Sequence, residues 1–191
     1  MEEKELVKAS ESGDEEAFSS LVKKYLTKVF NMVLHFTRDS QVADDLAQEI
    51  FIKAYFALPG FKHRSEFGTW LYRIAVNHVK DYLRKKKKVK EISLNYMKEP
   101  PAAEEDVIRS EERESMEEQK KQVLRRLIDE LPEKSKVILT LRDIQGFSYE
   151  EITKILRISM GTVDSRLFRA RRMLRQKFTT FLKEEGGKYG L

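Results

Sequence analysis

The 191-residue chain contains no cysteine, only four prolines and eight glycines, and a single tryptophan. Without cysteine it can form neither disulfides nor thiolate zinc sites, and it has no thiol nucleophile. No apolar run reaches the roughly 20 residues that a transmembrane helix needs. The first residues, Met1-Glu-Glu-Lys-Glu, lack the basic segment and the apolar core of a signal peptide. These absences predict a cytoplasmic protein.

Charged residues are abundant but unevenly distributed. They make up 36% of the chain, and the net charge is +5. One basic cluster lies within residues 80–90, and a second covers 157–183 with Asp164 as its only acidic residue. Residues 99–118 between them are strongly acidic. Two basic patches separated by an acidic spacer indicate two contacts with one polyanion.

Apolar residues recur at helical spacing along nearly the whole chain, so we predict an all-α protein. Asp14 or Ser12 would cap the first long helix, and Asp39 or Ser40 the second. Five helices are predicted before the last motif, at about residues 14–36, 40–57, 65–88, 108–130 and 132–146.

The segment Lys98-Glu-Pro-Pro-Ala-Ala-Glu-Glu-Asp divides the predicted helices into two groups. Tandem prolines stop helices, and like charges keep such a stretch extended. We therefore predict two small helical domains joined by a flexible linker. The predicted parts are a domain at 1–95, an acidic linker at 96–112, a second domain at 113–185 and a tail at 186–191.

Residues 148–172 predict a helix-turn-helix in the second domain. Ser148 and Glu151 fit a capping box at the start of its first helix. After a short turn, Ser159 can cap the second helix. Gly161 lies in the first turn of that helix, where we expect its small size to let another backbone come close.

The second helix of this motif divides into two faces at roughly 100° per residue. The face expected to be buried carries Val163, Leu167, Ala170 and Leu174. The opposite face carries Ser165, Phe168, Arg169 and Arg172, flanked by Arg166 and Arg171. An exposed Phe168 suits contact with a thymine methyl while arginines bind guanine edges and phosphates. The alternative is that Phe168 docks on a neighbouring helix of its own domain.

The third predicted helix carries a second candidate surface for nucleic acid. Its basic stripe consists of Arg73, Asn77, Lys80 and Arg84. Trp70 borders the stripe, and Phe61 lies in the loop before the helix. Aromatic rings stack on unpaired bases, cations hold phosphates and asparagine reads a base edge, so the surface suits single-stranded nucleic acid. The alternative is that both aromatic residues are part of the core.

The segment Asp44-Asp45-Leu-Ala-Gln48-Glu49 is a third notable cluster. We interpret it first as a docking surface for a basic partner helix, and second as the solvated start of a helix, where acids are favoured. A Mg²⁺ site of an α-helical enzyme ranks third, because no second acidic motif accompanies it. The sequence offers no nucleophile–base pair, no phosphate-binding loop and no histidines at metal-ligand spacing. We predict no catalytic residue, no metal and no cofactor.

Four segments, at residues 44–55, 67–77, 131–134 and 161–171, resemble the extracytoplasmic-function (ECF) group of bacterial sigma-70 family factors. They follow one another in the order and at the spacing of that group. The resemblance implies a non-catalytic specificity subunit of RNA polymerase with two helical domains, sigma regions 2 and 4, joined by a variable linker. Its implied function is to direct core polymerase to promoters and to help open the DNA there.

The resemblance also implies roles for individual residues. Docking on the clamp helices of the largest polymerase subunit would fall to Asp44, Asp45, Gln48, Glu49, Phe51 and Tyr55. Reading and opening of the promoter −10 element would fall to Phe61, Trp70, Arg73, Asn77, Lys80 and Arg84, with Phe61 and Asn77 at the pocket of a flipped base. Reading of the −35 duplex would fall to Thr162, Asp164, Ser165, Arg166, Phe168, Arg169, Arg171 and Arg172. Further implied partners are the polymerase flap and an anti-sigma factor, in a stress or envelope response.

Asp164 departs from the family pattern, which often has a basic residue at this position. Its carboxylate would either accept a hydrogen bond from cytosine N4 or repel the phosphate backbone. Two rival functions stay open from the residues alone. One is a dimeric helix-turn-helix repressor or activator, and the other is a Mg²⁺-dependent α-helical transferase.

Overall fold

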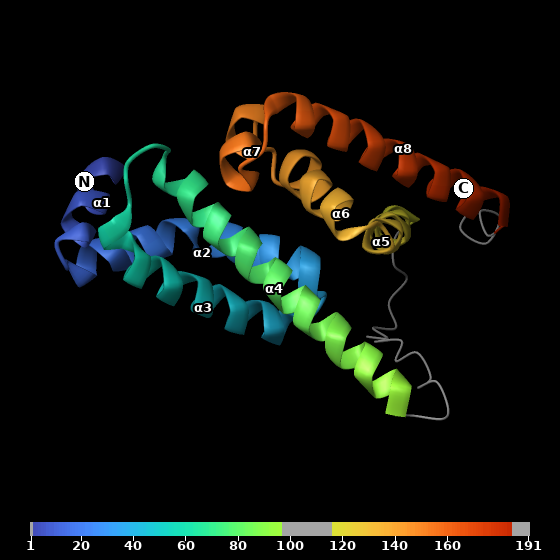
Figure 1. Ribbon diagram of the computed structural model, residues 1–191, viewed down its shortest axis with the longest axis horizontal. Coiled ribbons are helices and arrows are strands. Elements are labelled where there is room, and N and C mark those ends of the chain that lie inside the picture. Colours follow the sequence, from blue (N-terminus) through green and yellow to red (C-terminus); the bar gives the residue numbers. More distant parts are fainter. Residues whose placement is uncertain (1, 97–115, 185–191) are drawn as a thin grey trace.

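The computed structural model describes residues 2–96 and 116–184, and of residues 90–96 and 116–120 it describes only the backbone. The described residues form eight α-helices and no strand, which confirms the prediction of an all-α protein. None of these helices is both long enough and apolar enough to cross a membrane. The predicted tail and nearly all of the predicted linker lie outside the described residues. Figure 1 shows α1 to α4 as one group and α5 to α8 as a second group beside the first half of α4.

Three helices begin the first domain, α1 (Glu3–Glu11), α2 (Glu15–Thr37) and α3 (Ser40–Ala57), and both α1 and α3 pack on α2. Asp14 caps α2 by accepting a hydrogen bond from the Ala17 N–H at 2.9 Å. Asp39 caps α3 by accepting from the N–H groups of Gln41 and Val42, at 2.9 and 3.0 Å. The two aspartates are therefore the caps, and each satisfies backbone donors that the helix itself leaves unpaired.

The sequence pattern did not predict α1. This helix has only nine residues, too few to show a clear apolar period. Glu2 and Glu5 form a capping box in which the Glu2 N–H donates to Glu5 Oε2 at 2.9 Å. Val7 is buried, and the Tyr25 hydroxyl of α2 donates to Glu3 Oε2 at 2.9 Å. These contacts with α2 stabilise a segment that is too short to be a stable helix alone.

α4 (Phe67–Tyr96) follows the short 3₁₀-helix η1 (Leu58–Gly60) and a loop, and it packs on both α2 and α3 (Figure 1). The end of α3 before Pro59-Gly60 confirms the predicted stop. The largest fully buried side chains of this domain are Leu21, Val29, Met32, Val33, Ile50, Leu58 and Leu71. Burying one such side chain stabilises the fold by about 1.5–3 kcal/mol, so this apolar core holds the long helices together.

The second domain consists of α5 (Met116–Asp129), α6 (Glu133–Leu139), α7 (Tyr149–Leu156) and α8 (Met160–Glu184). Pro132 precedes α6, as predicted, but α6 ends at Leu139 and does not continue to Gly146. A π-helical turn, η2 (Thr140–Ile144), takes its place, with the Gln145 N–H donating to Thr140 O at 2.9 Å. Gly146 then turns the chain with a φ of 77°, a conformation that favours glycine.

α7 and α8 form the predicted helix-turn-helix. The Ser148 and Glu151 side chains each accept a hydrogen bond from the other's N–H, at 3.1 and 2.7 Å, which confirms the capping box. Arg157 ends α7 in the left-handed region with a φ of 53°. The Thr162 N–H donates to Ser159 Oγ at 3.2 Å, which confirms Ser159 as the cap of α8. Local hydrogen bonds therefore fix the turn between the two helices.

Gly68 lies in α4 against α2, where a larger residue would force a neighbouring side chain to shift. A Cβ at this position would meet Tyr25 Oη at 2.9 Å and its ring at 3.0 Å. Tyr25 is itself held by its hydrogen bond to Glu3. We expect Gly68→Ala to lower the free energy of unfolding by about 1–3 kcal/mol, because overpacking forces neighbouring groups to shift. Urea denaturation monitored by circular dichroism measures this change.

Gly161 of α8 provides the matched control for Gly68. A Cβ there would meet nothing within 4 Å, so the expected close approach of another backbone is wrong. Gly161→Ala should leave the free energy of unfolding unchanged or raise it by up to about 1 kcal/mol, because alanine favours helix. Equal effects of the two substitutions would contradict the tight packing at Gly68.

Two of the contacts between the domains bear on the candidate surfaces. At the first, α4 packs on α7, and the rings of Tyr72 and Phe147 are perpendicular with centroids 4.6 Å apart. At the second, Arg38 Nε at the end of α2 donates to Asp129 Oδ2 at 2.8 Å. Lys136 of α6 pairs with the same carboxylate. The side of α4 that carries Tyr72 therefore faces the second domain.

Candidate DNA and polymerase interfaces

The outer face of α8 is exposed, as its angular pattern predicted. Val163, Leu167 and Ala170 are at most 1% exposed, and Leu174 is half-buried. Phe168 on the opposite side is 68% exposed, which excludes its docking on a neighbouring helix of the same domain. Three polar residues of this face are also exposed: Ser165, Arg169 and Arg172. An exposed aromatic ring between arginines is thus available to a DNA groove.

Hydrogen bonds orient two of the arginines on this helix. Arg169 Nε donates to Ser165 O at 3.1 Å. Arg171 donates to both carboxylate oxygens of Asp143, at 2.6 and 3.2 Å, and this hydrogen bonding raises the pKa of Arg171. Arg171 therefore reaches a phosphate only by sharing or leaving Asp143.

Three further predicted residues lie along the first half of α8. Thr162 is half-buried, and its Oγ1 lies 2.8 Å from Ser159 Oγ. Asp164 is exposed. Arg166 is half-buried and lies near Lys80 of the first domain, where its charge contributes to a lowered Lys80 pKa that is mainly due to burial. Arg166 therefore lies at the domain contact, away from the outer face.

The basic stripe on α4 is divided by the domain contact. Asn77 and Arg84 are exposed, whereas Arg73 and Lys80 are half-buried. Burial lowers the pKa of Arg73, and the nearby charge of Arg157 lowers it further. In this arrangement only part of the stripe is open to a nucleic acid.

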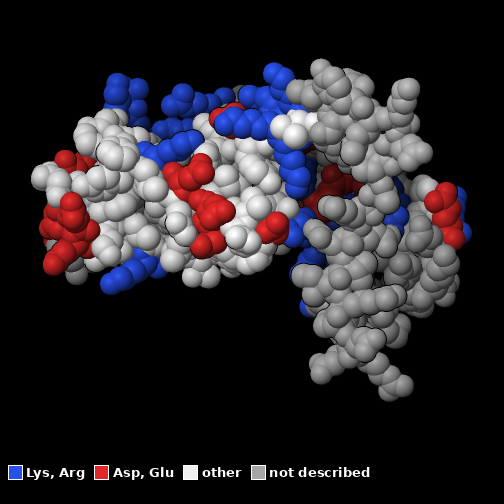
Figure 2. All heavy atoms as spheres, turned by 90° about the horizontal axis from the view of Figure 1, so that it is seen from below, with Lys and Arg blue, Asp and Glu red and all other residues white. Residues whose placement is uncertain are grey.

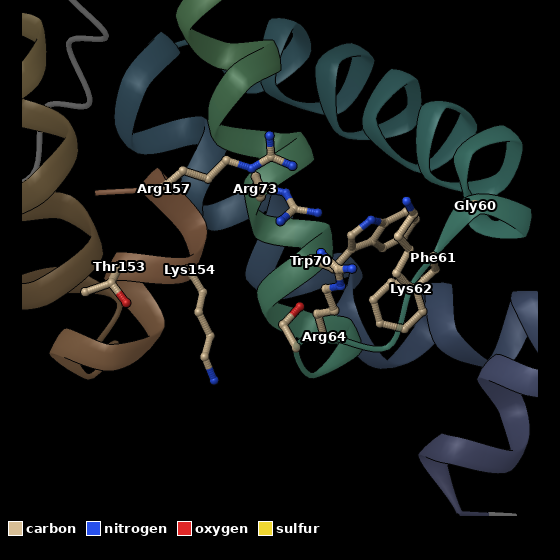
Figure 3. Close-up of a pocket in the computed structure, with 10 residues that line it drawn as sticks. Gly60, Phe61, Lys62, Arg64, Trp70, Arg73, Thr153, Lys154 and Arg157 are labelled. Atoms are coloured by element: carbon tan, nitrogen blue, oxygen red, sulfur yellow. The ribbon is translucent and has the colours of Figure 1, made fainter. Parts of the chain in front are cut away.

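Phe61 and Trp70 are only 8% and 6% exposed. Their ring centroids lie 5.1 Å apart, and Phe67 lies 6.4 and 5.6 Å from them. This burial favours the interpretation of both rings as core residues. Both also contribute to the wall of a cleft of about 470 Å³ next to the loop at residues 60–65 (Figure 3). They shape this cleft and do not offer a free stacking face.

The exposed face of α3 combines acidic, amide and apolar side chains. Its polar residues are exposed, as the docking interpretation requires: Asp44, Asp45, Gln48 and Glu49. Phe51 is only 6% exposed and belongs to the core, and Tyr55 is half-buried against a ring of α2. Ile52 and Phe56, by contrast, are 56% and 78% exposed. Figure 2, which views the molecule from the side of α3, shows acidic side chains in the middle of this face and basic ones along its upper edge.

Ile52 and Phe56 are the large apolar residues of α3 that a partner can reach, and neither was predicted as a site residue. Phe51 supports the helix from within the core. The sequence contains the signal that would have identified them, a spacing of four residues. Ile52 and Phe56 continue the exposed row of Gln48, outside the buried stripe that contains Ile50 and Ala54. Large exposed apolar side chains beside charged ones are typical of a contact surface.

The carboxylates of α3 do not converge on a common point. Gln48 Nε2 donates to Asp44 Oδ2 at 2.8 Å, while Glu49 Oε2 lies 2.8 Å from His78 Nε2. Among the side chains at 2–89 and 121–184, no three histidine or carboxylate groups lie together as metal ligands would. The donor geometry therefore gives the Mg²⁺ interpretation no support.

His35 and His78 should make the stability depend on pH. Burial lowers the pKa of both histidines. The charge of Arg38 lowers the pKa of His35 further, and the charge of Lys53 lowers that of His78, whereas Glu49 raises the pKa of His78 in part. An unfolded histidine has a pKa of about 6.5, so below that pH the unfolded chain binds protons that the folded one does not. The free energy of unfolding should therefore fall as the pH drops from about 7 to about 5.5. Urea denaturation should show a shallower fall for the double variant His35→Gln/His78→Gln, and an identical fall would contradict this cause.

Family models match both domains of the chain. The model described as Sigma-70 region 2 matches residues 21–89, and the model described as Sigma-70, region 4 matches residues 121–174. The first match covers most of α2, all of α3 and most of α4, and the second runs from within α5 to the middle of α8. The candidate DNA-contacting residues of α4 and α8 lie within these two matches.

Similar proteins cover nearly the full length of the chain. The RNA polymerase sigma-H factor of Pseudomonas aeruginosa is 37% identical over 187 residues, which is 96% of this chain and 97% of that protein. The ECF RNA polymerase sigma-E factor of Escherichia coli K12 is 38% identical over 192 residues, with 93% and 95% covered.

Two solved structures share the fold. The structure of CnrH in complex with the cytosolic domain of CnrY has a TM-score of 0.68 at 22% identity, with 92% of this chain and 96% of that chain covered. The sigma factor RpoE of Bartonella quintana, in complex with the anti-sigma factor NepR, has a TM-score of 0.62 at 23% identity, with 88% and 98% covered. With both sigma regions matched in order and relatives similar over almost their whole length, the chain belongs to the ECF group of the sigma-70 family of RNA polymerase sigma factors.

Proposed function

We propose that this protein is a non-catalytic specificity subunit that binds core RNA polymerase in the cytoplasm, directs it to promoters and helps open the DNA. The observation that carries the proposal is the outer face of α8, a basic helix surface with Phe168 exposed at its centre, in a chain of the sigma-70 family. The stripe on α4 and the mixed face of α3 supply the two other contacts that such a subunit needs.

The outer face of α8 would read the −35 element as duplex in the major groove. Phe168 would meet a thymine methyl, while Arg169 and Arg172 would bind a guanine edge or a phosphate. Asp164 would select cytosine at one position by accepting from its N4 group. Asp164→Ala should therefore lose this preference for cytosine. If the carboxylate merely repels the backbone, the same variant should instead bind every sequence more tightly.

The exposed part of the α4 stripe would hold the −10 element as single strand. Asn77 would read a base edge, and Arg84 would hold phosphates together with the exposed lysines at 85–88. A base flipped from the stack would lie beside Phe61, and its pocket contacts would offset an unstacking cost of a few kcal/mol. Full use of Arg73 and Lys80 requires the second domain to move away from α4.

The exposed face of α3 would dock on the clamp helices of the largest polymerase subunit. Its acids complement a basic partner, and Ile52 and Phe56 add apolar area that becomes buried on contact. The second domain would rest on the polymerase flap. The linker, outside the described residues, would pass near the active-site or RNA-exit channel, where its acidic residues mimic nucleic acid.

An anti-sigma factor would hold this protein inactive until a stress or envelope signal arrives. The support is similarity alone: the relatives include a sigma-E factor of the ECF group, and the RpoE structure with the same fold is a complex with an anti-sigma factor. Affinity capture of the full chain from its own cells, followed by transcription assays with the captured partner, tests this part.

Run-off transcription with core polymerase on a promoter library, with and without this protein, tests the main proposal. The expected result is a set of protein-dependent start sites that share a −10 and a −35 element. The Phe168→Ala variant should lose the −35 preference while core binding is unchanged. Tight binding of the protein alone to duplex DNA without new start sites would favour a repressor and overturn the proposal.

A further inference from the structure

The cleft at the first domain contact has walls from both domains (Figure 3). The first domain contributes the loop at 60–65 together with Trp70 and Arg73, and the second contributes Lys154 and Arg157 from α7 and its turn. Its volume of about 470 Å³ falls within the range of roughly 300–1,000 Å³ that small-molecule sites occupy. The cleft exists only because the two domains are in contact.

The lining of this cleft is strongly positive. It carries no acidic side chain and five cationic ones: Lys62, Arg64, Arg73, Lys154 and Arg157. Figure 3 shows Arg157 extending from the turn after α7 toward α4, where it comes beside Arg73. Like charges in a partly buried space repel one another more strongly than in water, so this cleft opposes the domain contact that forms it.

Three other cations near the domain contact have carboxylate partners. Arg38 and Lys136 share Asp129, and Arg171 is paired with Asp143. Among the side chains at 2–89 and 121–184, the five cleft cations make no ion pair with an acid. The cleft therefore lacks the carboxylate counter-charge that Arg38 and Lys136 have at the second contact.

We propose that this cleft binds a small multivalent anion of the phosphate class, such as pyrophosphate or a nucleoside polyphosphate, and that the bound anion holds the two domains together. Guanidinium groups bind phosphate oxygens in pairs of parallel hydrogen bonds, and lysines add point charges. Because Phe61 and Trp70 are nearly buried, recognition comes from the phosphate groups more than from stacking on a base. The cleft is also too small to take a folded protein segment of any length.

An occupied cleft would keep Arg73 and the neighbouring part of the α4 stripe covered by the second domain. The anion would then oppose promoter opening until polymerase or DNA separates the domains. This consequence rests on the proposed function, whereas anion binding itself does not.

Titration calorimetry of the full chain with sodium pyrophosphate, at constant ionic strength set by sodium chloride, tests the binding. The variant Lys154→Gln/Arg157→Asn removes two cleft charges, and asparagine tolerates the left-handed φ of 53° at position 157. The control Arg175→Gln/Lys183→Gln removes two charges from exposed positions of α8. We expect affinity for pyrophosphate to fall at least about tenfold in the cleft variant and less than about twofold in the control. Equal affinities of the two variants, or no binding beyond that of chloride, would overturn the proposal.

Energy transfer between two dyes tests whether the anion holds the domains together. Since the chain has no cysteine, Ser20→Cys in α2 and Thr180→Cys in α8 create the only labelling sites. Pyrophosphate should raise the transfer efficiency in the wild-type background and not in the cleft variant. If poly-glutamate raises it and pyrophosphate does not, the cleft takes an acidic protein segment and the proposal is wrong. Both assays omit polymerase, so their failure leaves the run-off transcription result unaffected.

Discussion

Replacing Ile52 and Phe56 together by aspartate should weaken binding to core RNA polymerase by at least about a hundredfold, with the fold intact. Both side chains are more than half exposed on α3, so the substitution leaves the core untouched. Burial of such a side chain in an interface stabilises a complex by about 1.5–3 kcal/mol. Each aspartate also brings a negative charge that would lose its hydration in the interface, which costs further binding free energy.

Leu26→Asp is the matched control for the α3 variant. Leu26 is 41% exposed on α2, outside the proposed docking face, so its replacement should leave polymerase affinity within about twofold. Fluorescence anisotropy of labelled protein titrated with core polymerase measures both affinities, and circular dichroism checks the fold. Unchanged affinity of the α3 variant, or an equal loss in the control, would mean that polymerase docks elsewhere.

Two neighbouring residues of α8 should give opposite results when changed to alanine. Leu167 is 1% exposed, so its truncation leaves a cavity and should lower the free energy of unfolding by about 2–5 kcal/mol. Phe168 is 68% exposed, so its truncation should change the free energy of unfolding by less than about 0.5 kcal/mol. Phe168→Ala should instead lower affinity for −35 duplex about tenfold, because it loses its contact with the bases.

Urea denaturation measures the first effect, and binding of the polymerase complex to promoter duplex at fixed salt measures the second. Replacing the contacted thymine by uracil removes only the methyl group. This replacement should weaken binding of the wild type but not of Phe168→Ala. A wild-type complex that is insensitive to every such replacement would show that Phe168 does not read a thymine methyl.

Local pattern predicted much of the fold. Ser148 and Ser159 are caps as the sequence predicts, and Asp14 and Asp39 are the caps among the two candidates predicted for each of the first helices. A helix start is predictable because it is decided by side chains within three residues of it. The two faces of α8 also follow directly from the helical repeat. The helix α1 was missed because nine residues show too little periodicity, and the turn η2 because no local signal distinguishes π-helical from α-helical geometry.

The docking face of α3 was only half predictable. The acids from Asp44 to Glu49 are exposed as expected, since charges are rarely buried. Phe51 and Phe56 are chemically identical, yet Phe51 is 6% exposed and Phe56 is 78% exposed. The four-residue spacing from Gln48 marks Phe56 as exposed, whereas the burial of Phe51 beside the main apolar stripe becomes evident only in the tertiary structure. The same is true of Phe61 and Trp70, whose burial depends on contacts with a third ring, Phe67.

The sequence by itself determined the all-α class, the helix-turn-helix and the basic face of α8, because helical period, caps and charge are properties of neighbouring residues. Only the tertiary structure decided how the two domains meet. Arg73 and Lys80 share a stripe with Asn77. Contact with the second domain leaves Arg73 and Lys80 half-buried, whereas Asn77 is exposed. That contact joins residues some 80 positions apart, Arg73 and Arg157, in one cleft. The pattern of neighbouring residues does not predict that Arg73 and Arg157 lie in one cleft, because their proximity depends on the packing of whole helices.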